Sequence, residues 1–133
     1  LEGEKMKFSF ETLERLQSLK TGELINCASQ LGCIAGNASP ELIKAAAEYS
    51  MALGRAFQVE DDILDVTGDE KTLGKPIGSD AESDKTTFLT FMTIEEAGDY
   101  AARLTKQAES AVAGFEGGDI LAALAGSLLS RKN

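Results

Sequence analysis

The sequence contains no histidine and no tryptophan, and it has only 2 prolines and 2 cysteines among 133 residues. Without histidine there is no Ser-His-Asp triad, no histidine metal ligand and no imidazole base. Aromatic residues make up only 6% of the chain. The residues that favour helices, Ala, Leu, Glu and Lys, are abundant instead. The formal net charge of −9 argues against nucleic acid or an anionic membrane surface as the main partner.

The two cysteines, Cys27 and Cys33, are six residues apart in a helical pattern. That separation corresponds to about 9 Å of helical rise, which is too long for a disulfide. We expect both thiols to be core residues of a reduced, cytoplasmic protein. We expect neither a membrane span nor a signal peptide, because no apolar run of the required length is present.

The first half of the chain has the apolar spacing of a helix from Phe10 to Ile34. Ser9 is the expected N-cap, with Glu11 in the first turn. The segment "KTG", residues 20–22, interrupts this pattern, so we expect a kink or local break there.

A second helix is expected from Ser39, as N-cap, and Pro40, at the first helical position, to about Val66, with Gly68 as its stop. Residues 69–84 contain glycine and proline without periodicity and are expected to form a long loop. Helices are expected to resume at residues 85–92, 93–114 and 118–132. No strand pattern is present, so the predicted class is all-α.

The end of the second helix, "FQVEDDILD", carries three carboxylates among apolar residues. Asp61 and Asp65 lie one turn apart on the same face, where like charges repel, and Asp62 points away from them. A cation between the carboxylates would remove this repulsion, and oxygen ligands suit Mg²⁺ or Ca²⁺. A solvated acidic surface is the simpler alternative for such a motif taken alone.

Three lysines extend this picture, because Lys20 lies at the expected helix break and Lys75 and Lys85 lie in or after the loop. Lysines bind phosphate as point charges. Carboxylates and lysines that converge on one mouth would suit a diphosphate brought in with its metal. Unrelated surface lysines are the alternative.

In order and spacing, "KTGELI", "FQVEDDILDVTGDEKTLGKPIGSD" and "DKTTF" resemble the carboxy-terminal half of the trans-isoprenyl (polyprenyl) diphosphate synthases. The resemblance covers nearly the whole chain and is greatest to the bacterial farnesyl diphosphate synthases. "FQVEDDILD" looks like the second aspartate-rich motif of that family. The resemblance implies an isoprenoid-synthase-type helical bundle and a homodimeric complete enzyme. It also implies a reaction in which an allylic diphosphate ionises, isopentenyl diphosphate attacks the carbocation, and a proton is then lost.

The resemblance also implies roles for individual residues. Three Mg²⁺ ions are expected in the complete site, one of them through this half. The residues that the resemblance would assign to metal binding are Asp61, Asp62 and Asp65, with Asp80 as a further acidic loop residue. The diphosphate would be bound by Lys20, Lys75 and Lys85. Lys20, Thr21 and Gln58 would form the catalytic set, in which Thr21 and Gln58 stabilise the carbocation, and Phe57 would line the homoallylic substrate site.

The first aspartate-rich motif, the isopentenyl-diphosphate-binding basic residues and the GGQ motif of this family are absent from the sequence. We therefore expect residues 1–133 to be the carboxy-terminal portion of a single all-α synthase domain, inactive alone. If this chain occurs by itself, its helices should expose a large apolar surface or pair with copies of themselves. Two alternatives are a non-catalytic helical subunit that modifies a full synthase, and a diphosphate-ionising enzyme like the terpene cyclases. The product length, ten to twenty carbons, depends on residues outside this sequence.

Overall fold

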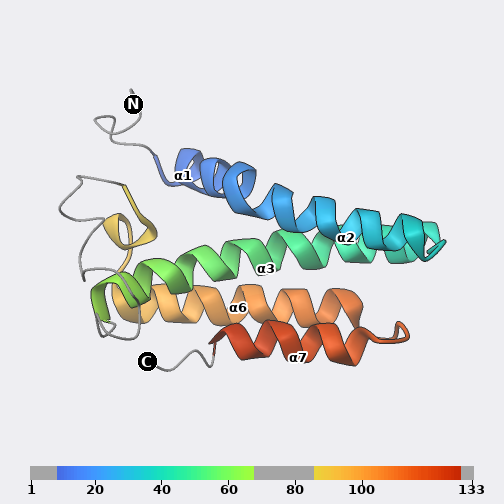
Figure 1. Cartoon of the computed structure of the whole chain (residues 1–133). Coiled ribbons are helices and arrows are strands. Elements are labelled where there is room, and N and C mark those ends of the chain that lie inside the picture. The colour runs from blue at the N-terminus through green and yellow to red at the C-terminus, as the bar shows by residue number, and fades with distance from the viewer. Residues whose placement is uncertain (1–8, 68–85, 130–133) are drawn as a thin grey trace.

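A computed structural model describes residues 9–67 and 86–129 of the chain. All its regular elements within these ranges are helical, which confirms the all-α prediction. In chain order they are α1 (Phe10–Gln17), the π-helix η2 (Ser18–Gly22), α2 (Glu23–Ala35), α3 (Pro40–Thr67), the 3₁₀-helix η3 (Phe88–Thr90), α6 (Ile94–Val112) and α7 (Gly118–Leu129). In Figure 1, α1 and α2 run along one side of α3, α6 runs along the other side, and α7 lies outside α6. No helix in the described part of the chain is long and apolar enough to cross a membrane.

Three of the helices begin at side-chain caps, two of them at the predicted Ser9 and Ser39 and one at the start of the predicted helix over residues 93–114. The Ser9 hydroxyl accepts the Thr12 backbone N–H at 3.2 Å, and the Ser39 hydroxyl accepts the Leu42 N–H at 3.2 Å. Thr93 and Glu96 form a reciprocal capping box at the start of α6. Each cap satisfies amide donors that a helix N-terminus leaves without a partner. These contacts are local in sequence, which explains why the helix starts agree with prediction.

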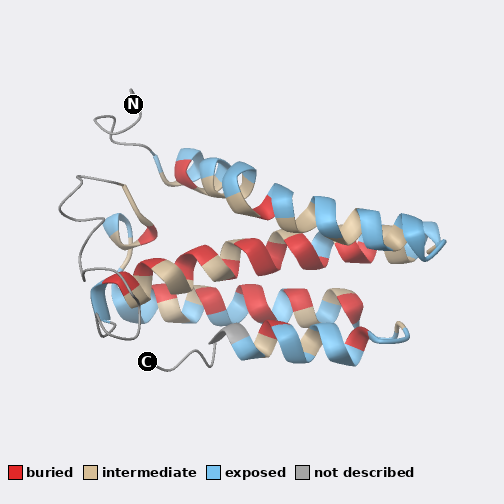
Figure 2. Cartoon of the chain, viewed as in Figure 1, coloured by how far each residue is buried: buried red, intermediate tan, exposed pale blue. Residues whose placement is uncertain are grey.

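The core lies where α3 packs against α6, with α1 and η3 closing one end. Leu13, Val59 and Phe88 are fully buried there, beside three alanines of α3 and α6 that are also fully buried. The buried stripes of α3 and α6 face one another in Figure 2. A second cluster joins α3, α6 and α7, and beside it the Tyr49 hydroxyl donates to the Leu121 carbonyl at 2.8 Å. Small alanines let the two long helices approach closely along their length.

The prediction of a helix over residues 85–92 is wrong in extent, because only Phe88–Thr90 forms one 3₁₀ turn among the residues described there. The Phe88 ring is fully buried and packs edge-on against Phe10, with ring centroids 6.0 Å apart. The Phe88 N–H donates to the Asp62 carboxylate at 2.8 Å. These two long-range contacts, rather than the hydrogen bonds of an α-helix, hold this segment in place. Gly68 and residues 69–84 lie outside the described residues.

The prediction that both cysteines belong to the core is also wrong. Cys27 is exposed and Cys33 is only half-buried, although both are free thiols as expected. The reason is that α2 packs on α3 along one face only, and none of the residues of α2 is fully buried. Cys27 lies away from that face.

Candidate functional site

The expected break at "KTG" is a π-helical segment that joins α1 to α2 without ending the helix. The Glu23 N–H donates to the Ser18 carbonyl, five residues earlier, which is the hydrogen bond of a π-turn. Such a turn inserts one extra residue into the helix and often occurs at functional sites. Here it lies beside α3, about halfway along that helix. The extra residue widens the helix at the segment that holds Lys20 and Thr21.

Thr21 and Gln58 are in direct contact although 37 residues separate them in sequence. The Thr21 hydroxyl donates to the Gln58 side-chain carbonyl at 2.6 Å. Gln58 is 8% exposed and Thr21 is half-buried, so the bond is shielded from water on most sides. Because the hydroxyl proton is used in this bond, the lone pairs of the Thr21 oxygen remain directed elsewhere. The two residues that the family resemblance pairs are therefore brought together.

The three carboxylates of α3 have different surroundings. Asp61 is half-buried, whereas Asp62 and Asp65 are 5% and 2% exposed. The Asp62 carboxylate accepts the backbone N–H of Phe88 and thereby ties the end of α3 to η3. Burial of a carboxylate is costly unless hydrogen bonds compensate it. Asp62 thus has a structural contact in addition to the metal role that the resemblance implies.

Carboxylate oxygens suit Mg²⁺, but the carboxylates of α3 do not make a complete metal site by themselves. Within residues 9–67 and 86–129, no cluster of three His, Cys, Asp or Glu side chains could hold a metal ion. Mg²⁺ prefers six oxygen ligands and commonly retains waters or takes substrate phosphates. Asp61 and Asp65 lie one turn apart on α3, so two carboxylates could supply only part of such a shell.

The remaining predicted residues divide into two groups. Lys20 is exposed on η2, and Phe57 is half-buried on α3 next to Gln58. Lys75, Asp80 and Lys85 lie outside the described residues. The structure therefore brings together Thr21, Gln58 and the acidic end of α3. The roles of Lys75, Asp80 and Lys85 in binding diphosphate and metal stay predictions.

A network between α1, α3 and α6 was not expected from the sequence. The Tyr100 hydroxyl donates to the Glu14 carboxylate, and Arg55 lies 3.6 Å from the same carboxylate oxygen. Burial, together with the Glu14 hydrogen bond and charge, raises the pKa of Tyr100 to about 12. Tyr100 and Glu14 are 86 residues apart, so periodicity gave no signal for this pair.

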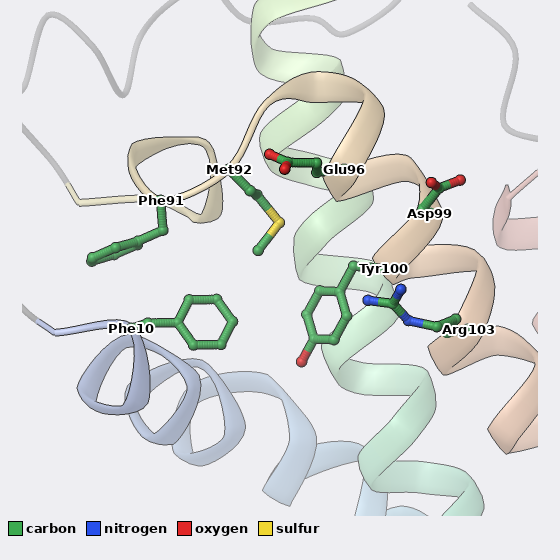
Figure 3. A pocket seen from close by; sticks show the side chains of 7 residues that line it. All are labelled: Phe10, Phe91, Met92, Glu96, Asp99, Tyr100 and Arg103. Carbon is green, nitrogen blue, oxygen red and sulfur yellow. The ribbon is translucent and has the colours of Figure 1, made fainter.

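This network borders an open hollow of about 440 Å³, shown in Figure 3. Its walls are the rings of Phe10, Phe91 and Tyr100 with the Met92 side chain, and the guanidinium of Arg103 lies 5.7 Å from the Tyr100 ring centroid. None of the predicted site residues lines the hollow. It is therefore separate from the contact between Thr21 and Gln58.

Comparison with known proteins gives consistent matches. A geranylgeranyl pyrophosphate synthase 10 (mitochondrial) of Arabidopsis thaliana is 37% identical and aligns with 100% of this chain but 40% of its own length. A geranylgeranyl diphosphate synthase of Saccharolobus solfataricus is 42% identical over 72% of this chain and 31% of its own length. The chain thus spans at most two fifths of these relatives.

The fold agrees with solved structures. The crystal structure of heptaprenyl diphosphate synthase from Staphylococcus aureus superposes with a TM-score of 0.88, over 99% of this chain and 54% of that one, at 20% identity. At that identity the superposition shows a shared fold, the helical bundle of the isoprenoid synthases. The sequence profile of the family described as Polyprenyl synthetase matches residues 1–115. The chain therefore belongs to the Polyprenyl synthetase family.

Proposed function

We propose that this chain is the carboxy-terminal part of a short-chain trans-prenyltransferase. The complete enzyme would join an allylic diphosphate to isopentenyl diphosphate. The observation that carries this proposal is the hydrogen bond between Thr21 and Gln58 beside the acidic end of α3. It connects the "KTG" segment with the second aspartate-rich motif, and these are the two elements that the family resemblance assigns to one site.

The reaction requires charge stabilisation rather than a protein nucleophile. The carbon–oxygen bond of the allylic diphosphate breaks, and the electron pair leaves with the diphosphate. The double bond of isopentenyl diphosphate then forms the new carbon–carbon bond. A proton is lost from the adduct, and the departing diphosphate is the proposed acceptor. No histidine is available in the sequence for this proton transfer.

The chain supplies two kinds of groups to this sequence. Lys20, exposed on η2, would hold phosphate oxygens as a point charge. The oxygens of Thr21 and Gln58 would face the carbocation, and their mutual hydrogen bond fixes them before the charge develops. Fixed dipoles in a site with little water stabilise a developing charge without reorganisation.

Asp61 would hold Mg²⁺, with Asp62 and Asp65 contributing partly through waters and Asp80 from the predicted loop. When bound, Mg²⁺ neutralises the diphosphate and makes it a better leaving group. Lys75 and Lys85 would bind the same diphosphate. The allylic and isopentenyl diphosphates are the proposed partners, and the complete enzyme is proposed to be a homodimer.

The product class is proposed as farnesyl or geranylgeranyl diphosphate. The names of both curated relatives favour the geranylgeranyl product. A cytoplasmic location also stays a prediction, because the Arabidopsis relative is named as mitochondrial.

The test is a chimera in which this chain replaces the corresponding carboxy-terminal part of the Saccharolobus solfataricus enzyme. With Mg²⁺ and both diphosphates, the chimera should form prenyl product, and Asp61→Ala should reduce kcat by orders of magnitude. Glu60→Ala, on the same turn of α3 but without an assigned role, is the matched control. Unchanged turnover in Asp61→Ala would favour the non-catalytic subunit instead.

The chain alone is expected to be inactive, because the first aspartate-rich motif is absent from its sequence. Condensation of the two diphosphates by the purified 133-residue chain would contradict this expectation.

A further inference from the structure

Two glycines bring the backbones of η2 and α3 close together. A methyl group added to Gly54 would lie 2.8 Å from the Gly22 Cα and 3.2 Å from the Gly22 nitrogen. Both atoms belong to the backbone, so no side-chain rotation could relieve the clash. Any residue larger than glycine at position 54 must therefore move η2 away from α3.

This approach coincides with the contact between Thr21 and Gln58. Gln58 lies one turn after Gly54 on α3, and Thr21 immediately precedes Gly22 in the π-turn. The hydrogen bond between Thr21 and Gln58 is 2.6 Å long, and O–H···O bonds weaken beyond about 3.0 Å. Moving the Gly22 Cα from 2.8 Å to an ordinary contact distance of 3.4 Å requires a shift of 0.6 Å, which would stretch this bond past that limit.

We propose that Gly54 is a positioning residue, whose missing side chain lets the π-turn seat on α3 and holds the Thr21 hydroxyl on Gln58. The steric part of this inference stands on the chain alone. Its catalytic part rests on the proposed function, since it makes Gly54 act on the carbocation-stabilising pair through that contact.

The opposite glycine offers a matched control, because the crowding is asymmetric. A methyl group added to Gly22 would meet the Met51 sulfur at 3.4 Å and the Met51 methyl carbon at 3.5 Å. These are ordinary van der Waals distances to the end of a flexible side chain. Gly22→Ala should therefore leave η2 in place, whereas Gly54→Ala should displace it. Gly98 in α6 has open space around its Cα and is a second control.

The first experiment measures a double-mutant cycle between Thr21→Val and Gln58→Met by urea unfolding of the 133-residue chain. The cycle is repeated in the Gly54→Ala and Gly22→Ala backgrounds. In the unaltered chain and in Gly22→Ala, we expect the coupling to be about fivefold in the unfolding equilibrium constant. In Gly54→Ala the coupling should disappear. If Gly54→Ala does not fold, all backgrounds are compared in a constant concentration of trimethylamine oxide, which favours the folded state.

The inference is overturned if Gly54→Ala keeps the full coupling, or if Gly22→Ala loses it as well. The second experiment measures the chimera, where Gly54→Ala should lower kcat by about a hundredfold with little change in KM, and Gly98→Ala should leave kcat unchanged. A chimera without any turnover would remove the proposed function but leave the unfolding cycle intact. The two failures are therefore distinguishable.

Discussion

The helices α3 and α2 differ in how much of each is covered, and the difference is the reverse of what their sequences suggest. α3 carries several charged residues, yet it buries side chains along most of its length, Asp62 and Asp65 included. α2 has a single charged residue, Glu23, yet none of its residues is fully buried. Burial in this chain follows the number of neighbouring helices rather than the polarity of the helix itself.

The uncovered side of α2 is a stripe of apolar residues. Leu24, Leu31 and Ile34 are 72%, 62% and 69% exposed. The chain spans at most two fifths of the two curated relatives described above. The stripe is the kind of surface expected where α2 packs against another part of a longer synthase, or against a copy of itself.

The largest expected effect on stability is at the buried Phe88, and the exposed Leu31 is its comparison. Phe88→Ala should lower the free energy of unfolding by about 3–5 kcal/mol, because Phe88 is fully buried among Phe10, Tyr100 and α3. Leu31→Ala should change it by less than about 0.5 kcal/mol. Urea unfolding followed by circular dichroism measures both. Similar losses in the two variants would show that α2 is covered in solution.

The second prediction separates two neighbouring carboxylates. Asp62→Ala leaves the buried Phe88 N–H without its acceptor and should cost about 1–3 kcal/mol of stability. Asp61→Ala should stay within about 0.5 kcal/mol and act on turnover of the chimera instead. Asp62→Asn, which keeps a side-chain oxygen, should recover part of the loss. An Asp62→Ala chain as stable as Asp61→Ala would mean that the link to Phe88 contributes nothing.

The third prediction concerns pH and the Tyr100 hydroxyl. The pKa of Tyr100 is raised to about 12 in the folded chain, against an ordinary value near 10. The unfolded chain therefore releases this proton first, and folded-state stability should decrease as pH rises from about 10 to 12. Tyr100→Phe should cost about 1 kcal/mol at neutral pH and flatten that decrease.

Tyr49 provides the control for this measurement, because burial raises its pKa as well. Tyr49→Phe should keep the Tyr100 part of the alkaline decrease. If the double variant Tyr49→Phe, Tyr100→Phe loses stability with rising pH as steeply as the unaltered chain, neither tyrosine causes the decrease.

The features that the sequence predicted correctly are those held by nearby residues. Ser39 with Pro40, and Thr93 with Glu96, mark helix starts through contacts three residues apart. α3 is helical through Thr67, the last described residue before the gap, which agrees with the helix expected to about Val66. Local chemistry determines such features, so a single sequence is sufficient to find them.

The candidate site depends on contacts across 26 to 37 residues, which periodicity cannot supply. Thr21 and Gln58 were paired by family resemblance, not by spacing, and the link from Asp62 to Phe88 was not anticipated. The sequence indicates a special role for Gly54 only weakly, because a glycine inside a long helix normally costs stability. The exposure of Cys27 was missed for the same reason, because nothing in α2 indicates which of its faces has a neighbour.

The smallest stability effect is expected on α2 itself, where two adjacent apolar residues have different surroundings. Leu24 is 72% exposed, whereas Ile25 packs against the cluster between α3 and α7. Leu24→Gln together with Leu31→Gln keeps helix propensity and should change unfolding free energy by less than about 0.5 kcal/mol. Ile25→Gln should lower the free energy of unfolding by more, since it places an amide among apolar side chains.

Sedimentation of the chain alone should show self-association, which the double variant Leu24→Gln, Leu31→Gln should weaken. Ala102→Gln, on the exposed side of α6, is the control and should leave the association unchanged. If the double variant associates as strongly as the unaltered chain, the stripe on α2 is not the surface that drives association.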